Sequence, residues 1–148
     1  GISETTIGLL WGEGVVAEVI LFIFGGSLLR YIRPIQLVIL GGFFGVIRWI
    51  GIGLEENLIN LFVLQALHGF TFGATHLGII HFIGDNVAED VSATAMSLYA
   101  SITGLTMGMM VVASGHIYAS LSGQAYFVVA TISALGCILC LFNSEHKY

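Results

Sequence analysis

The sequence predicts an all-α membrane protein, and its composition and hydropathy pattern are the evidence. Hydrophobic residues make up 57% of the 148 residues and charged residues only 9%, and the mean hydropathy is +0.98. Soluble domains carry roughly 25% charged residues, so this chain has too few charges to cover a surface that faces water. Apolar segments separated by short polar breaks predict five transmembrane helices, at residues 7–29, 35–53, 58–82, 93–117 and 124–142.

Each of these segments has the length of one membrane crossing. At a rise of 1.5 Å per residue, about 20 helical residues cross the roughly 30 Å hydrocarbon core. None of the segments shows the polar face of a soluble core helix, and none alternates in polarity as a transmembrane strand does. Neighbouring helices are expected to run antiparallel because the breaks between them are short, at residues 30–34, 54–57, 83–92 and 118–123.

The few basic residues predict an orientation in the membrane. Arg30 and Arg33 flank the first break and Lys147 lies in the tail, and five crossings put both places on the same side. The positive-inside rule assigns that side to the cytoplasm. The sequence therefore starts outside and ends in the cytoplasm, and Glu55 and Glu56 of the second break fit an outer loop.

Composition and motifs argue against several classes of function. A net charge of −5 with only four Lys and Arg gives no electrostatic basis for binding nucleic acid. Cys137 and Cys140 have the spacing of a redox or metal pair, but they lie deep in an apolar segment and are interpreted as packing residues. No metalloprotease, nucleophile-elbow or phosphate-loop motif occurs. We therefore expect no enzyme activity, no cofactor and no metal site.

Glycine is unusually common, at 20 of 148 residues. Gly69 and Gly73, and also Gly104 and Gly108, have the four-residue spacing that lets membrane helices approach closely. Ordinary helix packing explains this spacing, and sliding interfaces in a transporter are the alternative.

Ionisable residues inside the apolar segments are the candidate functional residues. A charge near the bilayer centre costs at least ~2.5–3.5 kcal/mol, so such residues are usually paired or face a wet cavity. Counting along the helices places Glu13, Arg48 and His68 in one layer, with Glu18 just below it, and His76 ~9 Å inside the middle of its span. We expect Arg48 to hold an anion or the carboxylate of Glu13 or Glu18. A purely structural ion pair and packed histidines are the alternatives.

Several runs of sequence resemble the major facilitator superfamily, and more closely its phenylpropionate-permease branch. They are Gly8-Leu9-Leu10-Trp11, Gly14-Val15-Val16-Ala17-Glu18-Val19-Ile20, Gly45-Val46-Ile47-Arg48-Trp49, Gln65-Ala66-Leu67-His68-Gly69-Phe70-Thr71-Phe72 and Thr75-His76-Leu77. The resemblance covers almost the whole chain. It implies a single bundle over residues 1–148, made of five helices from the C-terminal half of such a transporter, with the N-terminal half missing.

The charged positions are also similar to those of the lactose-permease branch. Gly12-Glu13, Arg48 and Leu67-His68 match positions that serve substrate binding and proton coupling in that family. Thr71 stands where that family has an acid, three residues after the histidine. The resemblance therefore implies that Glu18 or His76 replaces the missing proton site.

The function implied by the resemblance is proton-coupled symport of a small organic solute by alternating access in a bacterial-type inner (plasma) membrane. Its partners would be the substrate, the proton, the lipid bilayer and the missing N-terminal half. Arg48 would bind an anion, Glu18 or Glu13 would couple the proton, and His68 would relay it, because a free imidazole has a pKa of about 6.5. The branch name implies an aromatic carboxylate substrate. A sugar or nucleoside symporter, or a non-transporting membrane scaffold, is the alternative.

Overall fold

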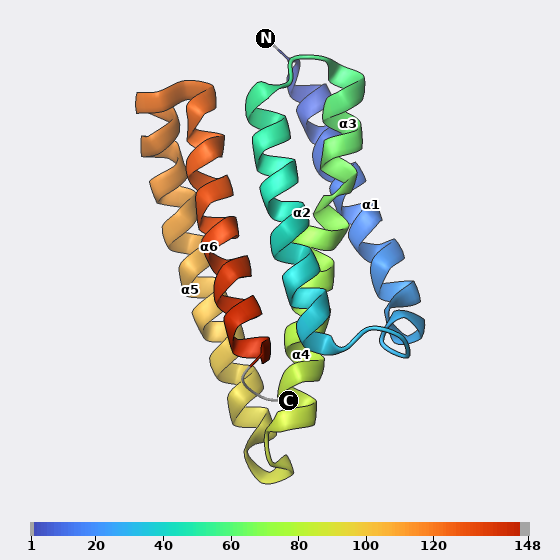
Figure 1. Ribbon diagram of the computed structural model, residues 1–148. Helices are drawn as coiled ribbons and strands as arrows, with labels where there is room; N and C mark the ends of the chain where they lie inside the picture. Colours follow the sequence, from blue (N-terminus) through green and yellow to red (C-terminus); the bar gives the residue numbers. More distant parts are fainter. Residues whose placement is uncertain (1, 146–148) are drawn as a thin grey trace.

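The computed structural model describes residues 2–145, and every regular element among them is helical. Lys147, one of the residues behind the expected orientation, lies outside this range. Successive long helices run in alternating directions, side by side (Figure 1). The elements are α1 (Glu4–Leu28), α2 (Pro34–Leu54), α3 (Leu58–Ala66), the π-helix η1 (Gly69–Ala74), α4 (Thr75–Asn86), α5 (Glu89–Leu121), the 3-10 helix η2 (Ser122–Gln124) and α6 (Ala125–Glu145).

Local sequence explains where the first helices begin. The hydroxyl of Ser3 accepts a hydrogen bond from the backbone N–H of Thr6 at 3.2 Å and caps α1. Pro34 is the first residue of α2. A backbone N–H at this position makes no hydrogen bond within the helix, so proline, which lacks the N–H, is well tolerated there. The side-chain oxygen of Asn57 caps α3 by accepting from the N–H of Ile59 at 2.9 Å. These signals set the ends of the two turns that connect the first three spans.

The structure has four helical segments that qualify as membrane spans by length and hydropathy, whereas the sequence predicted five. They are Glu4–Leu28, Pro34–Leu54, Leu58–Asn86 and Glu89–Phe142. The fourth is 54 residues long because only η2 separates α5 from α6, so that helical structure continues through the turn. Ser122 adopts a positive φ of 50° there, and α5 and α6 run in opposite directions on either side of it (Figure 1).

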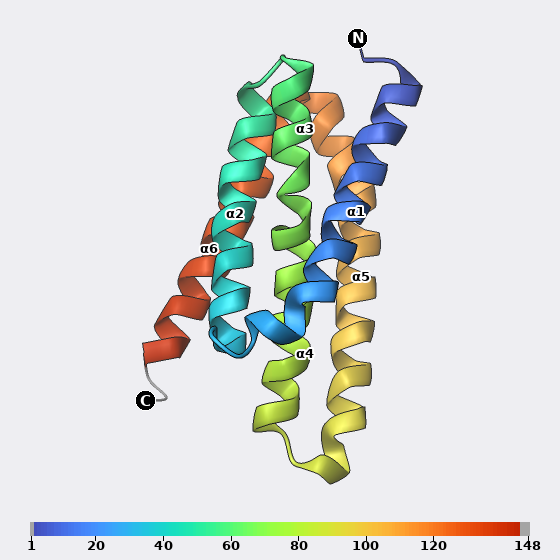
Figure 2. The same ribbon diagram turned by 90° about the vertical axis from the view of Figure 1, so that its right-hand side faces the viewer.

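Helix α2 lies in the middle of the described bundle. It packs against α6 on one side and against α4 and η1 on the other (Figure 2). Its buried residues are Leu37, Gly41, Gly45 and Arg48, which follow one face of the helix. A Cβ at Gly41 would lie 2.9 Å from the carbonyl oxygen of Phe70, so glycine is what lets the third span approach.

The two glycine stripes have different surroundings. A Cβ at Gly69 would lie 2.8 Å from the carbonyl oxygen of Ala17, and one at Gly73 would lie 3.3 Å from Cγ of Glu18. This stripe is therefore a close contact between η1 and α1. A Cβ at Gly104 or Gly108 of α5 meets nothing within 4 Å in the described part of the chain.

The outer surface of the bundle is apolar. Large side chains such as Ile23 of α1, Val63 of α3 and Val111 of α5 are exposed by 70%, 65% and 70%. Helix α5 has no buried residue at all. An exposed apolar surface this extensive is typical of helices that face lipid, as expected of an integral membrane protein.

Candidate functional site

Arg48 is the buried charge around which the candidate site is built. Only 6% of this residue is exposed, and no other charged or polar residue in the described range is classed as buried. Its Nη2 donates to Oε1 of Gln65 at 2.8 Å, and its Nη1 donates to Oγ1 of Thr71 at 3.3 Å. The guanidinium carbon also lies 4.5 Å from the centre of the Trp49 ring, a cation–π distance. Neutral groups therefore surround the cation.

The expected contact between Arg48 and a carboxylate is not formed. Neither Glu13 nor Glu18 lies within ion-pair distance of Arg48 in the described structure. The Nε atom of Arg48 is buried and has no hydrogen-bond partner. Gln65 and Thr71 occupy two of its five N–H donors, so the guanidinium keeps its positive charge and part of its donor capacity. An unpaired buried cation is costly unless an anion reaches it.

Glu18 faces His68 instead. Oε2 of Glu18 lies 3.7 Å from Nε2 of His68, and the two side chains are 18% and 24% exposed. This distance fits an ion pair when the imidazole is protonated, and it exceeds a direct hydrogen bond. Gly14 of α1 gives His68 the room to approach, because a Cβ there would lie 3.3 Å from that of His68. The pair therefore joins α1 to the third span.

Two further buried polar atoms near the predicted layer have no partner. They are Oε2 of Glu13 on α1 and Nδ1 of His68 at the start of η1. Together with Nε of Arg48 on α2, three spans each contribute one unsatisfied polar atom. Buried polar groups are nearly always hydrogen-bonded, so each of these atoms is a position where water, a ligand or another part of the protein can bind.

A column of aromatic rings extends from His68 along the third span. The rings of His68 and Phe72 are stacked at 5.8 Å with 9° between their planes, and those of Phe72 and His76 at 5.8 Å with 8°. Nδ1 of His76 lies 2.9 Å from the hydroxyl of Tyr99 on α5. The π-helix η1 widens the turn between the two histidines, and such insertions are frequent at functional sites.

A cavity of about 490 Å³ opens beside Arg48. Its polar wall includes Arg48 and Gln65, and much of the rest is aromatic. The rings of Trp49 and Tyr126 stack at 6.0 Å with 12° between their planes. The remaining lining residues are Ile2, Ile7, Leu10, Trp11, Ile52, Leu61 and Tyr118. An apolar cavity with a few convergent polar groups is the usual form of a small-molecule site.

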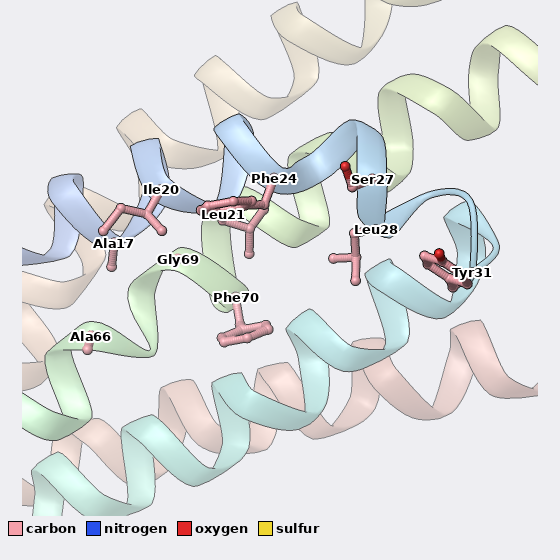
Figure 3. Close-up of a pocket in the computed structure, with 10 residues that line it drawn as sticks. All are labelled: Ala17, Ile20, Leu21, Phe24, Ser27, Leu28, Tyr31, Ala66, Gly69 and Phe70. Carbon is pink, nitrogen blue, oxygen red and sulfur yellow. The ribbon is translucent and has the colours of Figure 1, made fainter.

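A second cavity, of about 580 Å³, lies between α1 and the third span and contains none of the predicted site residues. Leu21 and Phe24 of α1 stand on one side of it and Phe70 on the other (Figure 3). Its lining is almost entirely apolar. It therefore offers a surface to apolar groups and no means of holding a charge.

The remaining candidates for chemistry are clustered metal ligands and the two cysteines. No group of three or more His, Cys, Asp or Glu side chains in the described part of the chain could hold a metal ion. Cys137 donates a weak hydrogen bond to the carbonyl oxygen of Ile39 at 3.5 Å, and both Cys137 and Cys140 are free. Cys137 thus packs α6 against α2.

The family follows from a match over most of the chain. The model of the MFS_1 like family matches residues 1–129. The chain belongs to this family of major facilitator superfamily transporters. It is 31% identical over 133 residues to the "Probable 3-phenylpropionic acid transporter" of Escherichia coli, covering 90% of this chain and 35% of the relative. It is 24% identical over 149 residues to "Uncharacterized transporter YwbF" of Bacillus subtilis, covering 98% of this chain and 37% of that relative.

The family membership confirms the resemblance seen in the sequence. The chain spans about a third of the length of these relatives, so they contain much that this chain does not. No solved structure matches the chain. The names of both relatives describe them as transporters.

Two residues next to Arg48 were overlooked as site residues in the sequence. Thr71 was noted only as the position of a missing acid, yet its hydroxyl accepts from Arg48 and donates to the carbonyl oxygen of His68 at 3.2 Å. Gln65 lies three residues before His68, and helical spacing alone could have placed them on one face. A glutamine inside an apolar segment, three residues before a histidine, was the feature of the sequence that could have identified Gln65 as a site residue.

Tyr99 was missed because its partner lies on another span. It is a half-buried tyrosine in α5, and nothing in the surrounding sequence distinguishes it from an interfacial aromatic. Its contact with His76 depends on how α5 is rotated against α4. Sequence spacing fixes positions within one helix and leaves such rotations open.

Proposed function

We propose that the full-length protein is a proton-coupled symporter that carries a small organic anion by alternating access. The observation that supports this most directly is Arg48, which is 6% exposed, has an unpartnered Nε and has no carboxylate partner in the described structure. A substrate carboxylate that binds Arg48 would supply the missing negative charge. Charge-assisted hydrogen bonds of this kind are about twice as strong as neutral ones.

An aromatic carboxylate suits the surroundings of Arg48 best. The cavity beside it includes the stacked rings of Trp49 and Tyr126, against which a planar ring can pack. The relative named as a 3-phenylpropionic acid transporter points to the same chemical class. A sugar or nucleoside would gain stacking here and would leave the guanidinium without an anion.

The Glu18–His68 pair is the proposed proton-coupling element. A proton on His68 completes an ion pair with Glu18 across 3.7 Å, and a proton on Glu18 removes that attraction. Either event changes how firmly α1 is held to the third span. Glu18 lies beside Gly73 and Gln65 lies beside Gly14, so movement of α1 also reaches the partners of Arg48. Glu13 is assigned a role in substrate affinity, because it lies five residues before Glu18, more than one helical turn away, and its Oε2 has no partner.

The proposed setting is a bacterial-type inner membrane, with the turn at 29–33 in the cytoplasm and the turn at 55–57 outside. Arg30 and Arg33 support this orientation through the positive-inside rule. In the full-length protein without Cys137 and Cys140, an impermeant thiol reagent on intact cells should label Glu56→Cys and leave Tyr31→Cys unlabelled. Labelling of position 31 alone would reverse the orientation.

The decisive experiment replaces Arg48 in the full-length protein and measures uptake of 3-phenylpropionate into proteoliposomes. Arg48→Ala should abolish uptake, and Arg48→Lys should retain part of it because the charge remains. Arg48→Ala would remove the charge-assisted hydrogen bonds to the substrate carboxylate, so the effect on uptake should be large. Normal uptake by Arg48→Ala would remove Arg48 from the site.

A membrane scaffold without transport activity is the alternative, and the glycine contact between η1 and α1 is what favours it. A scaffold would use the buried charges only to hold helices together. Simultaneous replacement of Arg48, Glu18 and His68 by apolar residues should then leave its function intact. A transporter with the same replacements should lose substrate uptake even when the protein folds.

A further inference from the structure

The third span carries two separate polar pairs with an aromatic ring between them. The first is Glu18–His68, with Oε2 and Nε2 at 3.7 Å. The second is His76–Tyr99, with Nδ1 and the hydroxyl at 2.9 Å. Phe72 lies between the two imidazoles, stacked against each at 5.8 Å and nearly parallel to both.

This spacing rules out direct proton exchange between the histidines in the described conformation. Proton transfer needs donor and acceptor atoms at about 2.6–3.2 Å, or one water between them. The ring centre of Phe72 lies 5.8 Å from the centre of each imidazole, and the Phe72 side chain has no atom that can bind a proton. Phe72 therefore occupies the shortest route between the two pairs.

Apolar rings contact the second pair. Among the described residues, Phe22 of α1 meets the His76 ring edge to face, with 6.2 Å between the ring centres. Phe72 stacks on the face of the imidazole, and Tyr99 lies against it and within hydrogen-bond distance. No carboxylate of the described chain forms an ion pair with His76. The hydroxyl of Tyr99 is thus the polar group that can stabilise a charged His76.

We propose that His76 and Tyr99 form a second proton site and that Phe72 is the barrier separating it from Glu18–His68. The inference rests on the proposed proton coupling and adds the route that the proton takes. In this scheme Nδ1–H of His76 donates to the hydroxyl oxygen of Tyr99. Nε2 then accepts the proton that leaves His68, and one positive charge moves with it. Nothing is oxidised or reduced.

The π-helix gives the barrier a means of opening. Phe72 lies within η1, whose six residues Gly69–Ala74 depart from α-helical hydrogen bonding. A change of these residues to α-helical hydrogen bonding, with N–H to C=O bonds four residues apart, would rotate the side chains that they carry. Such a change would move Phe72 out of the stack and let a water molecule connect the two imidazoles. While Phe72 stays in the stack, its ring prevents protons from crossing in the absence of substrate.

Proton leak in the absence of substrate tests this barrier. The full-length protein is reconstituted into sealed vesicles that contain a pH-sensitive dye, and a pH gradient is imposed under a potassium–valinomycin clamp. Phe72→Ala should raise the rate of proton entry at least about tenfold over wild type, equivalent to ~1.4 kcal/mol off the barrier. The matched control, Phe72→Leu, keeps an apolar side chain of similar bulk and should leak no more than wild type.

Two further variants keep the test decisive when Phe72→Ala folds poorly. Phe72→Val removes less volume and should leak measurably more than Phe72→Leu. Adding His76→Phe to the leaking variant removes the proton acceptor and should return proton entry to the wild-type rate. A leak that survives His76→Phe, or equal rates in Phe72→Ala and Phe72→Leu, would overturn the proposal.

The positioning role of Tyr99 has its own readout. Tyr99→Phe keeps the ring and removes the hydroxyl, so a purely structural role predicts unchanged coupling. We expect fewer protons carried per substrate molecule, with substrate exchange intact. Substrate-driven proton uptake by the wild type is measured in the same vesicles. Its absence would refute the proposed symport itself, whereas the leak comparison would still decide the role of Phe72.

Discussion

Gln65 and Arg48 are joined by a hydrogen bond of 2.8 Å between an amide oxygen and the buried guanidinium. A neutral acceptor at this place positions the cation without cancelling its charge. A carboxylate at the same distance would form an internal ion pair and compete with an anionic substrate. The identity of residue 65 therefore governs whether Arg48 is free to bind a ligand.

Gln65→Glu is expected to raise the KM for an anionic substrate at least about tenfold, which corresponds to ~1.4 kcal/mol of lost binding free energy. The new carboxylate keeps the shape of the amide and neutralises Arg48. Uptake kinetics in proteoliposomes provide the measurement. Gln36→Glu is the matched control, since it adds the same charge at an exposed position in the first turn of α2. An unchanged KM for Gln65→Glu would show that substrate does not use Arg48.

Gly69→Ala is expected to destabilise the protein by ~1–3 kcal/mol, as overpacking does in a close contact. The added Cβ would lie 2.8 Å from the backbone carbonyl oxygen of Ala17, which has no side-chain freedom to move aside. Thermal unfolding in detergent provides the comparison. Gly12→Ala meets nothing within 4 Å and should leave the unfolding temperature unchanged or raise it. Equal shifts for both variants would contradict the close contact of η1 with α1.

The loop at Glu55 is expected to loosen in acid. Hydrogen bonds to the Glu55 carboxylate from the backbone N–H of Asn57, the side-chain amide of Asn60 and the N–H of Glu56 lower its pKa below the ordinary value of 4.5. A lowered folded-state pKa means that this stabilisation is complete above pH 4.5 and is lost as the pH falls through the lower, folded-state value.

Amide hydrogen exchange at Asn57 tests this pH dependence. Protection relative to Glu55→Gln should be present at pH 6 and should disappear as the carboxylate takes up its proton. The variant itself has no titrating group at this position, so its protection should follow only the intrinsic pH dependence of exchange. Identical pH profiles for the two proteins would show that the Glu55 carboxylate does not hold the loop.

Hydropathy and length predicted the positions of the long apolar helices to within a few residues, because insertion into a bilayer demands long apolar segments. The described helices depart from the predicted ends by a few residues, for example at Asn86 against residue 82 and at Glu89 against residue 93. The count of spans is four rather than five because η2 joins α5 to α6 without a non-helical residue, although the two helices run in opposite directions (Figure 1). Sequence alone gives no measure of how completely a tight turn breaks a helix.

The sequence predicted a layer of candidate site residues and did not predict how they pair. Counting residues placed Glu13, Arg48 and His68 at similar depth, and each contributes an unsatisfied buried atom. The pairing depends on helix rotation, and the π-turn after His68 changes that rotation without any signal in residue type. For this reason the sequence left open whether Arg48 meets an anion, Glu13 or Glu18, and in the structure Glu18 lies beside His68.

The central claim is that Glu18 couples proton movement to transport, and Glu18→Gln in the full-length protein tests it most directly. The amide mimics the protonated carboxyl group, so exchange of 3-phenylpropionate across sealed vesicles should continue at a rate near that of the wild type. Uphill uptake driven by a proton gradient should vanish. Glu13→Gln, as the control, should weaken substrate affinity and keep uphill uptake. Accumulation of substrate by Glu18→Gln against its gradient would contradict the account.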